Sequence, residues 1–182
     1  MVVDRKNRPH VVYCLFSVRY NTTYIGLTHN LAERIIAHNK GKCKWTRHRG
    51  PWRIVACIRG FPTLQWASRC ERYIKHETDL SAAYWCLGKA EKRVARMIQS
   101  LQQERFGEGH PPTSDLELTF RVMWPKLRLG QDVKEDMMSL PHHVTVSTCV
   151  NSVFYMCIPI SFAHERLYAP SIRSFPHTGG LL

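Results

Sequence analysis

The N-terminal part of the chain contains three short hydrophobic runs separated by polar segments. Residues 11–17 and 23–28 are rich in β-branched and aromatic side chains, which is typical of strands. The polar residues 19–22 between these two runs predict that they form a hairpin. Residues 52–58 predict a third strand.

Helical spacing follows the second and third of these runs. Asn30 is a suitable N-cap residue, and Glu33 is spaced to complete a capping box with it. We expect this helix to end near Gly41, because glycine readily adopts the conformation that stops a helix. Thr63 is a suitable cap for a second helix that continues to about Lys75.

The pattern is less regular in the rest of the chain. Residues 87–106 predict a third helix with four apolar residues on one face, and residues 116–124 alternate like a strand. The apolar residues of that helix are Val94, Met97, Ile98 and Leu101. Residues 144–163 carry no charge but contain many polar and β-branched residues, so they favour one or two strands over a membrane span. We expect a flexible tail from Pro170.

The order strand, strand, helix, strand, helix predicts an α+β fold. We expect a small sandwich in which helices flank a three-stranded mixed sheet, followed by a C-terminal extension. The predicted division is a first domain over residues 8–79, a helix and strand extension over 80–125 that packs on it, and an uncharacterised region with its tail over 126–182.

Charge is distributed unevenly along the 182 residues. The net charge is +12, and residues 1–79 contain 15 Lys and Arg against five Asp and Glu. A chain this basic favours a polyanionic partner, and the distribution predicts that the N-terminal part meets it. The composition is that of a folded globular protein.

The seven cysteines do not form a recognisable framework. Their number is odd, and no two are separated by two residues, which argues against paired disulfides and a zinc ribbon. The first ten residues contain no apolar core segment, so a secretory signal is not expected. We therefore expect free thiols in a reducing compartment.

Five side chains of the basic half carry candidate chemistry. Arg34 and His38 lie four apart on the first predicted helix and share one face. Tyr13 and Tyr24 fall near the middles of the two hairpin strands, where pairing can bring the phenols together. Glu71 is one of few acids in this half. Taken singly, each has an ordinary alternative: a solvated helix face, core aromatics, an ion-pair partner.

A basic segment follows the first predicted helix. It combines six cations with no acid and also contains Trp45 and Trp52. The alternative to a solvated loop is a surface that follows a phosphate backbone and stacks an aromatic ring on an unpaired base. The predicted nucleic-acid-binding residues are Lys40, Lys42, Lys44, Trp45, Arg47, Arg49 and Arg53.

Together these residues resemble the GIY-YIG nuclease domain. The carrying motifs are VYC, YIG nine residues later, NLAERIIAH, and the glutamate of ASRCE. The resemblance implies metal-dependent phosphodiester hydrolysis, with Arg34 on the phosphate and Glu71 on one Mg²⁺ or Mn²⁺ ion. Tyr13 is the first choice as general base or relay, which would require Arg34 and the metal to lower its pKa. Tyr24 and His38 then orient the water or pass the proton on.

Further motifs are similar to the Slx-type branch of that superfamily. These are RIIAHNKGK, RGPWRIV and GFPT, and the similarity covers residues 8–125. It implies a catalytic subunit that cuts flaps, splayed arms and Holliday junctions in the nucleus, with a scaffold subunit or a second copy as partner. Val11 and Val12 replace the Gly-Ile of the first motif, and Ile36 stands where a second arginine is common. The ligand pattern of the branch's C-terminal zinc module is not found.

Other readings of the same residues stay open. A homing or restriction-type nuclease on this fold would need a DNA-reading domain, which residues 126–182 do not resemble. A non-catalytic DNA-binding protein derived from the fold would not need all five candidate side chains. A pure interaction scaffold does not account for the charge asymmetry.

Overall fold

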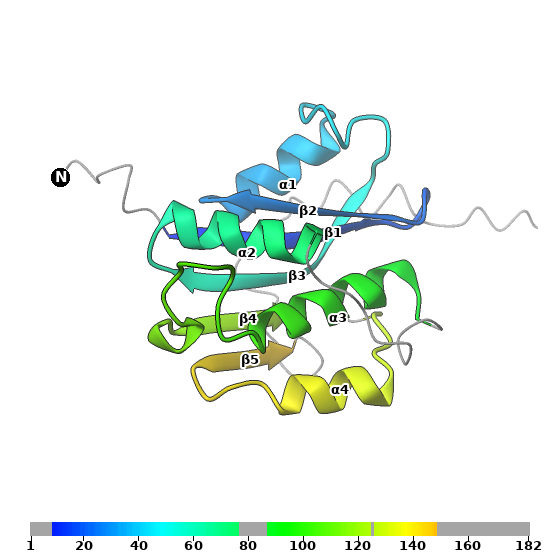
Figure 1. Ribbon diagram of the computed structural model, residues 1–182. Helices are drawn as coiled ribbons and strands as arrows, with labels where there is room; N and C mark the ends of the chain where they lie inside the picture. The colour runs from blue at the N-terminus through cyan, green and yellow to red at the C-terminus, as the bar shows by residue number, and fades with distance from the viewer. Residues whose placement is uncertain (1–8, 77–86, 125, 149–182) are drawn as a thin grey trace, which may run out of the picture. The chain divides into compact units, whose positions relative to one another are not determined.

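A computed structural model describes residues 9–76, 87–124 and 126–148. Its centre is a five-stranded sheet with the order β2-β1-β3-β4-β5 (Figure 1). All neighbouring pairs are antiparallel except β4 and β5. The strands are β1 His10–Ser17, β2 Thr22–Thr28, β3 Trp52–Phe61, β4 Leu118–Val122 and β5 Val144–Thr148.

The α+β class is confirmed, but the sheet has five strands rather than the expected three. Strand β1 pairs antiparallel with both β2 and β3, so the mixed character of the sheet comes only from the parallel pair β4 and β5. Residues 56–59 of β3 pair with 119–122 of β4, which joins the predicted extension to the same sheet. Strand β5 continues that sheet, so the region after residue 126 also contributes a strand to it.

Four α-helices are described. They are α1 Leu31–Asn39, α2 Leu64–His76, α3 Lys89–Leu101 and α4 Gln131–Met138. The first three match predicted helices, whereas α4 was not expected because only Val133 of its eight residues is buried. A helix with one buried side chain carries almost no apolar periodicity in its sequence. All four expected apolar residues of α3 are buried.

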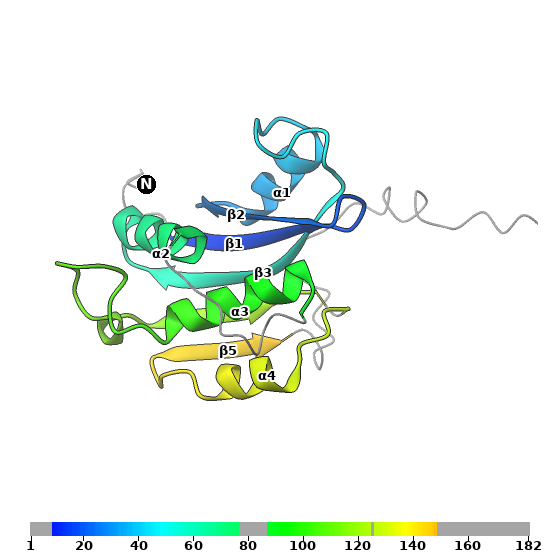
Figure 2. The same cartoon turned by 45° about the vertical axis from the view of Figure 1, so that its right-hand side comes forward.

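Strand β1 divides the core into two clusters by alternation. Tyr13 packs in the smaller cluster, together with Leu31 of α1. Cys14 packs in the larger cluster, together with Ala67 of α2 and Val94 of α3. Because successive side chains of a strand point to opposite faces, α1 covers one face of the sheet and α2 and α3 cover the other (Figure 2). Strand β1 is therefore buried on both faces.

Helix α1 begins at the expected N-cap, but the backbone N–H of the cap residue has a different hydrogen-bond acceptor from the one expected. The side chain of Asn30 accepts a hydrogen bond from the Glu33 backbone N–H at 3.2 Å, which confirms the N-cap. The Asn30 N–H donates to the Thr28 hydroxyl at 3.1 Å instead of to the Glu33 side chain. Thr28 thus supplies the second half of the cap from the end of β2, and this fixes where α1 leaves the sheet.

Two expectations about the remainder of the chain are only partly covered. Strand β5 occupies the start of the uncharged run 144–163, in agreement with the strand prediction. The rest of that run and the expected tail from Pro170 lie outside the described residues. Within the described residues no helix has the length and apolar character needed to cross a bilayer. The cysteines described as free thiols are Cys14, Cys43, Cys57 and Cys70.

Candidate active site

Tyr13 faces α1 from the interior strand β1 and is fully buried. Its partner across the β1–β2 pair is Gly26, while Tyr24 pairs with Leu15. A Cβ atom placed at Gly26 would lie 2.5 Å from the Tyr13 hydroxyl oxygen and 2.7 Å from Cε1 of Tyr24. No real Cβ atom tolerates such distances, so the glycine of the YIG motif provides the space in which both rings lie.

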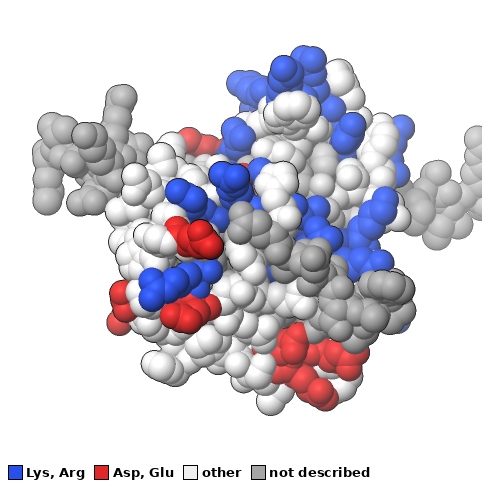
Figure 3. Space-filling view, in the orientation of Figure 1, with Lys and Arg blue, Asp and Glu red and all other residues white. Residues whose placement is uncertain are grey.

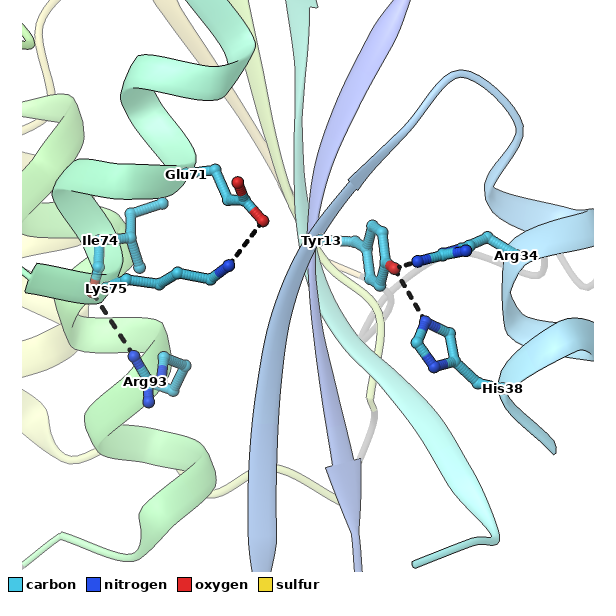
Figure 4. Close-up of polar contacts among 7 residues, drawn as sticks. All are labelled: Tyr13, Arg34, His38, Glu71, Ile74, Lys75 and Arg93. Atoms are coloured by element: carbon cyan, nitrogen blue, oxygen red, sulfur yellow. Dashed lines mark hydrogen bonds and ion pairs between the residues drawn. The ribbon is translucent and has the colours of Figure 1, made fainter. Parts of the chain in front are cut away.

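Helix α1 brings two further side chains to the Tyr13 hydroxyl. Arg34 Nε donates a hydrogen bond to it at 3.0 Å, and His38 Nε2 lies 2.8 Å from it. The two residues are one helical turn apart and therefore approach the phenol from one helix face. Figure 4 shows both converging on the oxygen of Tyr13. The expected grouping of Tyr13, Arg34 and His38 is present.

His38 has a second hydrogen-bond partner that the sequence did not indicate. Its Nδ1 lies 2.5 Å from the hydroxyl oxygen of Thr46, a buried residue in the loop after α1. The Thr46 hydroxyl donates to the Cys43 carbonyl, so its oxygen is left to accept the Nδ1–H of a neutral imidazole. His38 Nε2 then accepts the hydrogen bond of the Tyr13 hydroxyl.

Burial and charge set the protonation states of this group. Burial raises the pKa of Tyr13 to about 12, and the hydrogen bond and charge of Arg34 lower it by less than burial raises it. Burial, with a contribution from the Arg34 charge, lowers the pKa of His38 to about 4. In the protein without DNA or metal, Tyr13 is therefore a neutral phenol and His38 a neutral acceptor at pH 7. The expected lowering of the Tyr13 pKa is not achieved by Arg34 alone.

Tyr24 joins the group through its ring. The ring centroid of Tyr24 is 6.3 Å from that of Tyr13 and 5.1 Å from that of His38. The cross-strand prediction is confirmed in a diagonal form, because Tyr13 and Tyr24 are offset by two positions in the register. Tyr24 is half-buried, whereas Tyr13 and His38 are fully covered.

Glu71 lies on α2, across the strand ribbons from the Tyr13–Arg34–His38 group in the view of Figure 4. Its carboxylate oxygen Oε1 accepts from Lys75 Nζ at 2.8 Å, and both side chains are partly buried. The ammonium group of Lys75 is also 5.9 Å from the ring centroid of Tyr24. Glu71 thus reaches the other candidate residues through Lys75 and Tyr24, and not by a hydrogen bond drawn to any of the three on α1 and β1.

Lys75 is a residue that the sequence analysis did not select. It follows Glu71 by four positions on one helix, and the rule for opposite charges at this spacing is the signal that would have found it. No comparable signal exists for Thr46, because the path of an irregular loop decides which of its hydroxyls meets His38.

The basic segment comprises the loop between α1 and β3 together with the start of β3, and two residues hold the ends of the loop. Asn39 accepts from the Trp52 N–H at 2.7 Å and donates to the Trp52 carbonyl at 3.2 Å. The six cations of the segment are all exposed. Figure 3 shows Lys and Arg side chains gathered over this part of the molecule and acidic ones over α4. The members of the loop surface are Lys40, Lys42, Lys44, Arg47, Arg49 and Arg53.

The two tryptophans of this segment have different environments. Trp45 is 74% exposed, and its ring lies 5.6 Å from Lys44 Nζ. Trp52 is buried, and its indole N–H donates to the Thr46 carbonyl at 3.0 Å. Trp45 is therefore available to a ligand, whereas Trp52 supports the loop and is not an exposed stacking platform.

The fold and this group of residues coincide with a known catalytic domain. A family model described as the GIY-YIG catalytic domain matches residues 9–82, which include all five candidate side chains. The chain belongs to the GIY-YIG nuclease superfamily.

The chain is also similar to individual proteins. The chain is 36% identical over 140 residues to the Brugia malayi "Structure-specific endonuclease subunit SLX1 homolog", covering 65% of this chain and 38% of that protein. It is 32% identical over 133 residues to the human "Structure-specific endonuclease subunit SLX1", covering 65% and 44%. The chain spans less than half the length of these two relatives. It is also 41% identical over 68 residues to "UPF0213 protein BH0048" of Halalkalibacterium halodurans, covering 37% and 70%.

Proposed function

We propose that this protein is a structure-specific endonuclease that hydrolyses phosphodiester bonds in branched DNA during repair or recombination. The observation that carries the proposal is the hydrogen-bonded group of Tyr13, Arg34 and His38 beside an exposed basic loop. It is supported by the catalytic-domain match and by two relatives named as structure-specific endonuclease subunits.

Tyr13 and His38 would act together on the attacking water. As a water proton moves to the Tyr13 oxygen, the Tyr13 hydroxyl proton moves to His38 Nε2, which forms an imidazolium. The water oxygen then bonds to phosphorus, and the bond from phosphorus to the leaving oxygen breaks. The leaving oxygen takes up a proton from solvent water, and the His38 imidazolium releases its proton to solvent and so becomes neutral again. This relay avoids a free tyrosinate, whose formation is unfavourable when the pKa of Tyr13 is about 12. It requires that the negative charge of the bound phosphate stabilise the His38 imidazolium, because the pKa of His38 is about 4 without DNA.

Arg34 would stabilise the negative charge that develops on the phosphate. Its Nε is engaged with Tyr13, so the terminal guanidinium nitrogens remain to donate to the non-bridging oxygens. Arginine stays charged at any working pH, and loss of such a contact typically slows a reaction by about 10²–10³-fold. Tyr24 would orient the water or the phosphate from the open side of the group.

Glu71 would hold one divalent cation, Mg²⁺ or Mn²⁺. Within residues 9–76, 87–124 and 126–148 no group of three His, Cys, Asp or Glu side chains is arranged to hold a metal. A single carboxylate fits an ion that keeps most of its coordination sites for water and phosphate, as Mg²⁺ prefers. The ion would supply charge neutralisation at the phosphate.

The loop surface and Trp45 would bind the DNA. Lysine and arginine contacts to phosphates carry little sequence information, so they suit recognition of DNA shape. An exposed indole ring provides a stacking surface for a base that is unpaired at a branch point. Binding of this kind weakens steeply with salt.

A scaffold subunit is the partner that we propose, with a second copy of this chain as the alternative. The support is that both relatives are named as subunits. The proposed site of action is the nucleus, where branched DNA intermediates arise.

A substrate panel tests the proposal. Purified protein with Mg²⁺ or Mn²⁺ is incubated with end-labelled flap, splayed-arm, Holliday-junction and linear duplex DNA of matched sequence. We expect incisions near the branch points and none in the linear duplex. Equal cutting of the linear duplex, or no cutting of any branched substrate with either metal, would refute the proposed function.

A further inference from the structure

The ammonium group of Lys75 contacts the Glu71 carboxylate and lies over the Tyr24 ring. Lys75 Nζ is 2.8 Å from Glu71 Oε1 and 5.9 Å from the centroid of Tyr24. Lys75 and Glu71 side chains are 33% and 22% exposed, so the pair is shielded from water more than an ordinary surface ion pair. A carboxylate oxygen, a positive charge and a phenol face are thus already assembled without a metal.

The position of this ammonium is significant because its two neighbours, Glu71 and Tyr24, both have proposed roles at the site. Glu71 is the carboxylate proposed to hold the divalent cation, and Tyr24 is the residue through which α2 approaches the Tyr13–Arg34–His38 group. A cation bound at Glu71 Oε1 would occupy the space next to Lys75 Nζ. Two positive charges this close repel each other strongly in a partly buried site. The metal and the ammonium therefore compete for the same carboxylate.

We propose that Lys75 is a positioning residue whose ammonium occupies the cation position at Glu71 until a divalent ion displaces it. This inference rests on the proposed metal-binding role of Glu71. Lys75 holds the carboxylate of Glu71 in a fixed orientation while the site has no metal. In return, the ammonium raises the metal concentration that is needed for loading.

The displaced Lys75 ammonium can move to a DNA phosphate. Lysine has a flexible four-carbon stem with three donors on its terminal nitrogen, so the ammonium can swing away from Glu71 without moving the helix. A bound DNA phosphate would attract it and would at the same time favour the incoming divalent cation. Loading of metal and binding of DNA should therefore promote each other at this site.

Three variants separate charge from packing. Lys75→Met removes the charge and keeps the apolar stem, whereas Lys75→Arg keeps the charge. Lys134→Gln is the matched control, because it removes one positive charge from the exposed surface of α4. Circular dichroism establishes that each variant is folded before it is used.

Two measurements follow the metal directly. Mn²⁺ binding to the DNA-free protein is titrated by electron paramagnetic resonance of the free ion. The amount of Mn²⁺ bound by Glu71→Gln at each concentration is subtracted, and the difference is the binding at Glu71. The Mg²⁺ concentration for half-maximal cleavage of a branched substrate is measured separately. If Lys75 competes with the metal, Lys75→Met requires about two- to fivefold less of either ion, the range expected when an ion pair of this kind is removed. Lys75→Arg and Lys134→Gln stay near the wild-type values.

An unchanged or weaker metal affinity in Lys75→Met would overturn the inference, as would an equal gain in Lys134→Gln. A folded Lys75→Met protein that binds Mn²⁺ more tightly but, like the wild type, cuts no branched DNA would support the inference and refute the proposed function. The two claims therefore fail separately.

Discussion

Gly26 lies directly opposite Tyr13 in the β1–β2 pair, and the Tyr13 ring fills the space where a side chain at position 26 would lie. The glycine of the YIG motif is therefore a steric requirement of the site. It allows a large aromatic ring from β1 to turn toward α1 while β1 and β2 stay hydrogen-bonded.

Substitution of Gly26 should damage activity more than stability. In Gly26→Ala the new Cβ would meet the Tyr13 hydroxyl at 2.5 Å, so the phenol must move away from Arg34 and His38. Overpacking of this kind costs about 1–3 kcal/mol of unfolding free energy. A shift of the reacting group by about 1 Å lowers the rate by about 10²-fold. Denaturant unfolding and single-turnover cleavage measure the two effects.

Gly130 provides the control for that experiment. A Cβ at Gly130 meets only the far end of Leu87, at an ordinary 3.4 Å. Gly130→Ala should leave both the cleavage rate and the stability close to wild type. A Gly26→Ala protein with normal cleavage would show that the position of the Tyr13 ring is unimportant.

Thr46 should matter through the orientation of His38. In Thr46→Val the shape is kept, but the acceptor for the His38 Nδ1–H is lost. An unpaired buried N–H costs about 1–3 kcal/mol, so the imidazole should rotate or change tautomer. We expect cleavage to slow by at least tenfold and Thr46→Ser to restore most of it. Nitrogen-15 NMR shifts of the His38 ring report the tautomer, and unaltered shifts with a slow enzyme would contradict this explanation.

The pH dependence of stability should reveal the neutral state of His38. Its pKa is lowered to about 4 by burial and by Arg34, from an ordinary value of 6.5. Between these two values the unfolded chain binds a proton that the folded protein does not. The contribution of His38 to the free energy of unfolding is thus fully present above pH 6.5. It falls as the pH is lowered toward 4, with a slope approaching about 1.4 kcal/mol per pH unit. Urea unfolding at pH 4.5–7.5 measures it.

The His38→Gln variant isolates this contribution. Glutamine does not titrate, so the difference in unfolding free energy between wild type and variant should shrink as the pH is lowered through this window. A constant difference would mean that the pKa of His38 is the same in the folded protein as in the unfolded chain.

Each cation of the basic loop should contribute to the affinity for DNA and to its dependence on salt. Each of Lys42→Gln, Arg47→Gln and Arg49→Gln removes one exposed cation of the loop surface. If each contacts one phosphate, the slope of log K against log salt should become less steep by about one unit per residue. Fluorescence anisotropy at several salt concentrations measures the slope, with Lys134→Gln as a control that should not change it.

Trp45 should act differently from these cations. Loss of stacking in Trp45→Ala should weaken binding to a junction with an unpaired base by about 1–3 kcal/mol and leave linear duplex binding nearly unchanged. Equal losses for both DNAs would assign Trp45 to the backbone contacts instead.

The sequence was sufficient to select the candidate site residues that lie on helices and strands. Arg34 and His38 were found because an i, i+4 spacing places two side chains on one helix face. Tyr13 and Tyr24 were found because both lie within strongly β-branched runs. Gly26 was noted only as part of a motif, and its reason became visible in the strand register.

Other features depend on tertiary structure. The buried position of Thr46 follows from a loop whose ends are held by Asn39 and Trp52, and nothing local predicts it. The sequence predicted strands at the positions of β4 and β5, but it did not predict that they pair with β3 and with each other over long sequence separations. The ion pair of Glu71 with Lys75 was predictable from spacing, but its position beside Tyr24 was not.

The central claim is that Arg34, Tyr13 and His38 form one hydrolytic group that acts on branched DNA. Its most direct test is single-turnover cleavage of a branched substrate by wild type and Arg34→Ala, with binding of the same DNA measured by anisotropy. We predict that cleavage falls by about 10²–10³-fold while the dissociation constant changes by less than about threefold. Cleavage by Arg34→Ala at the wild-type rate, with binding intact, would contradict the account.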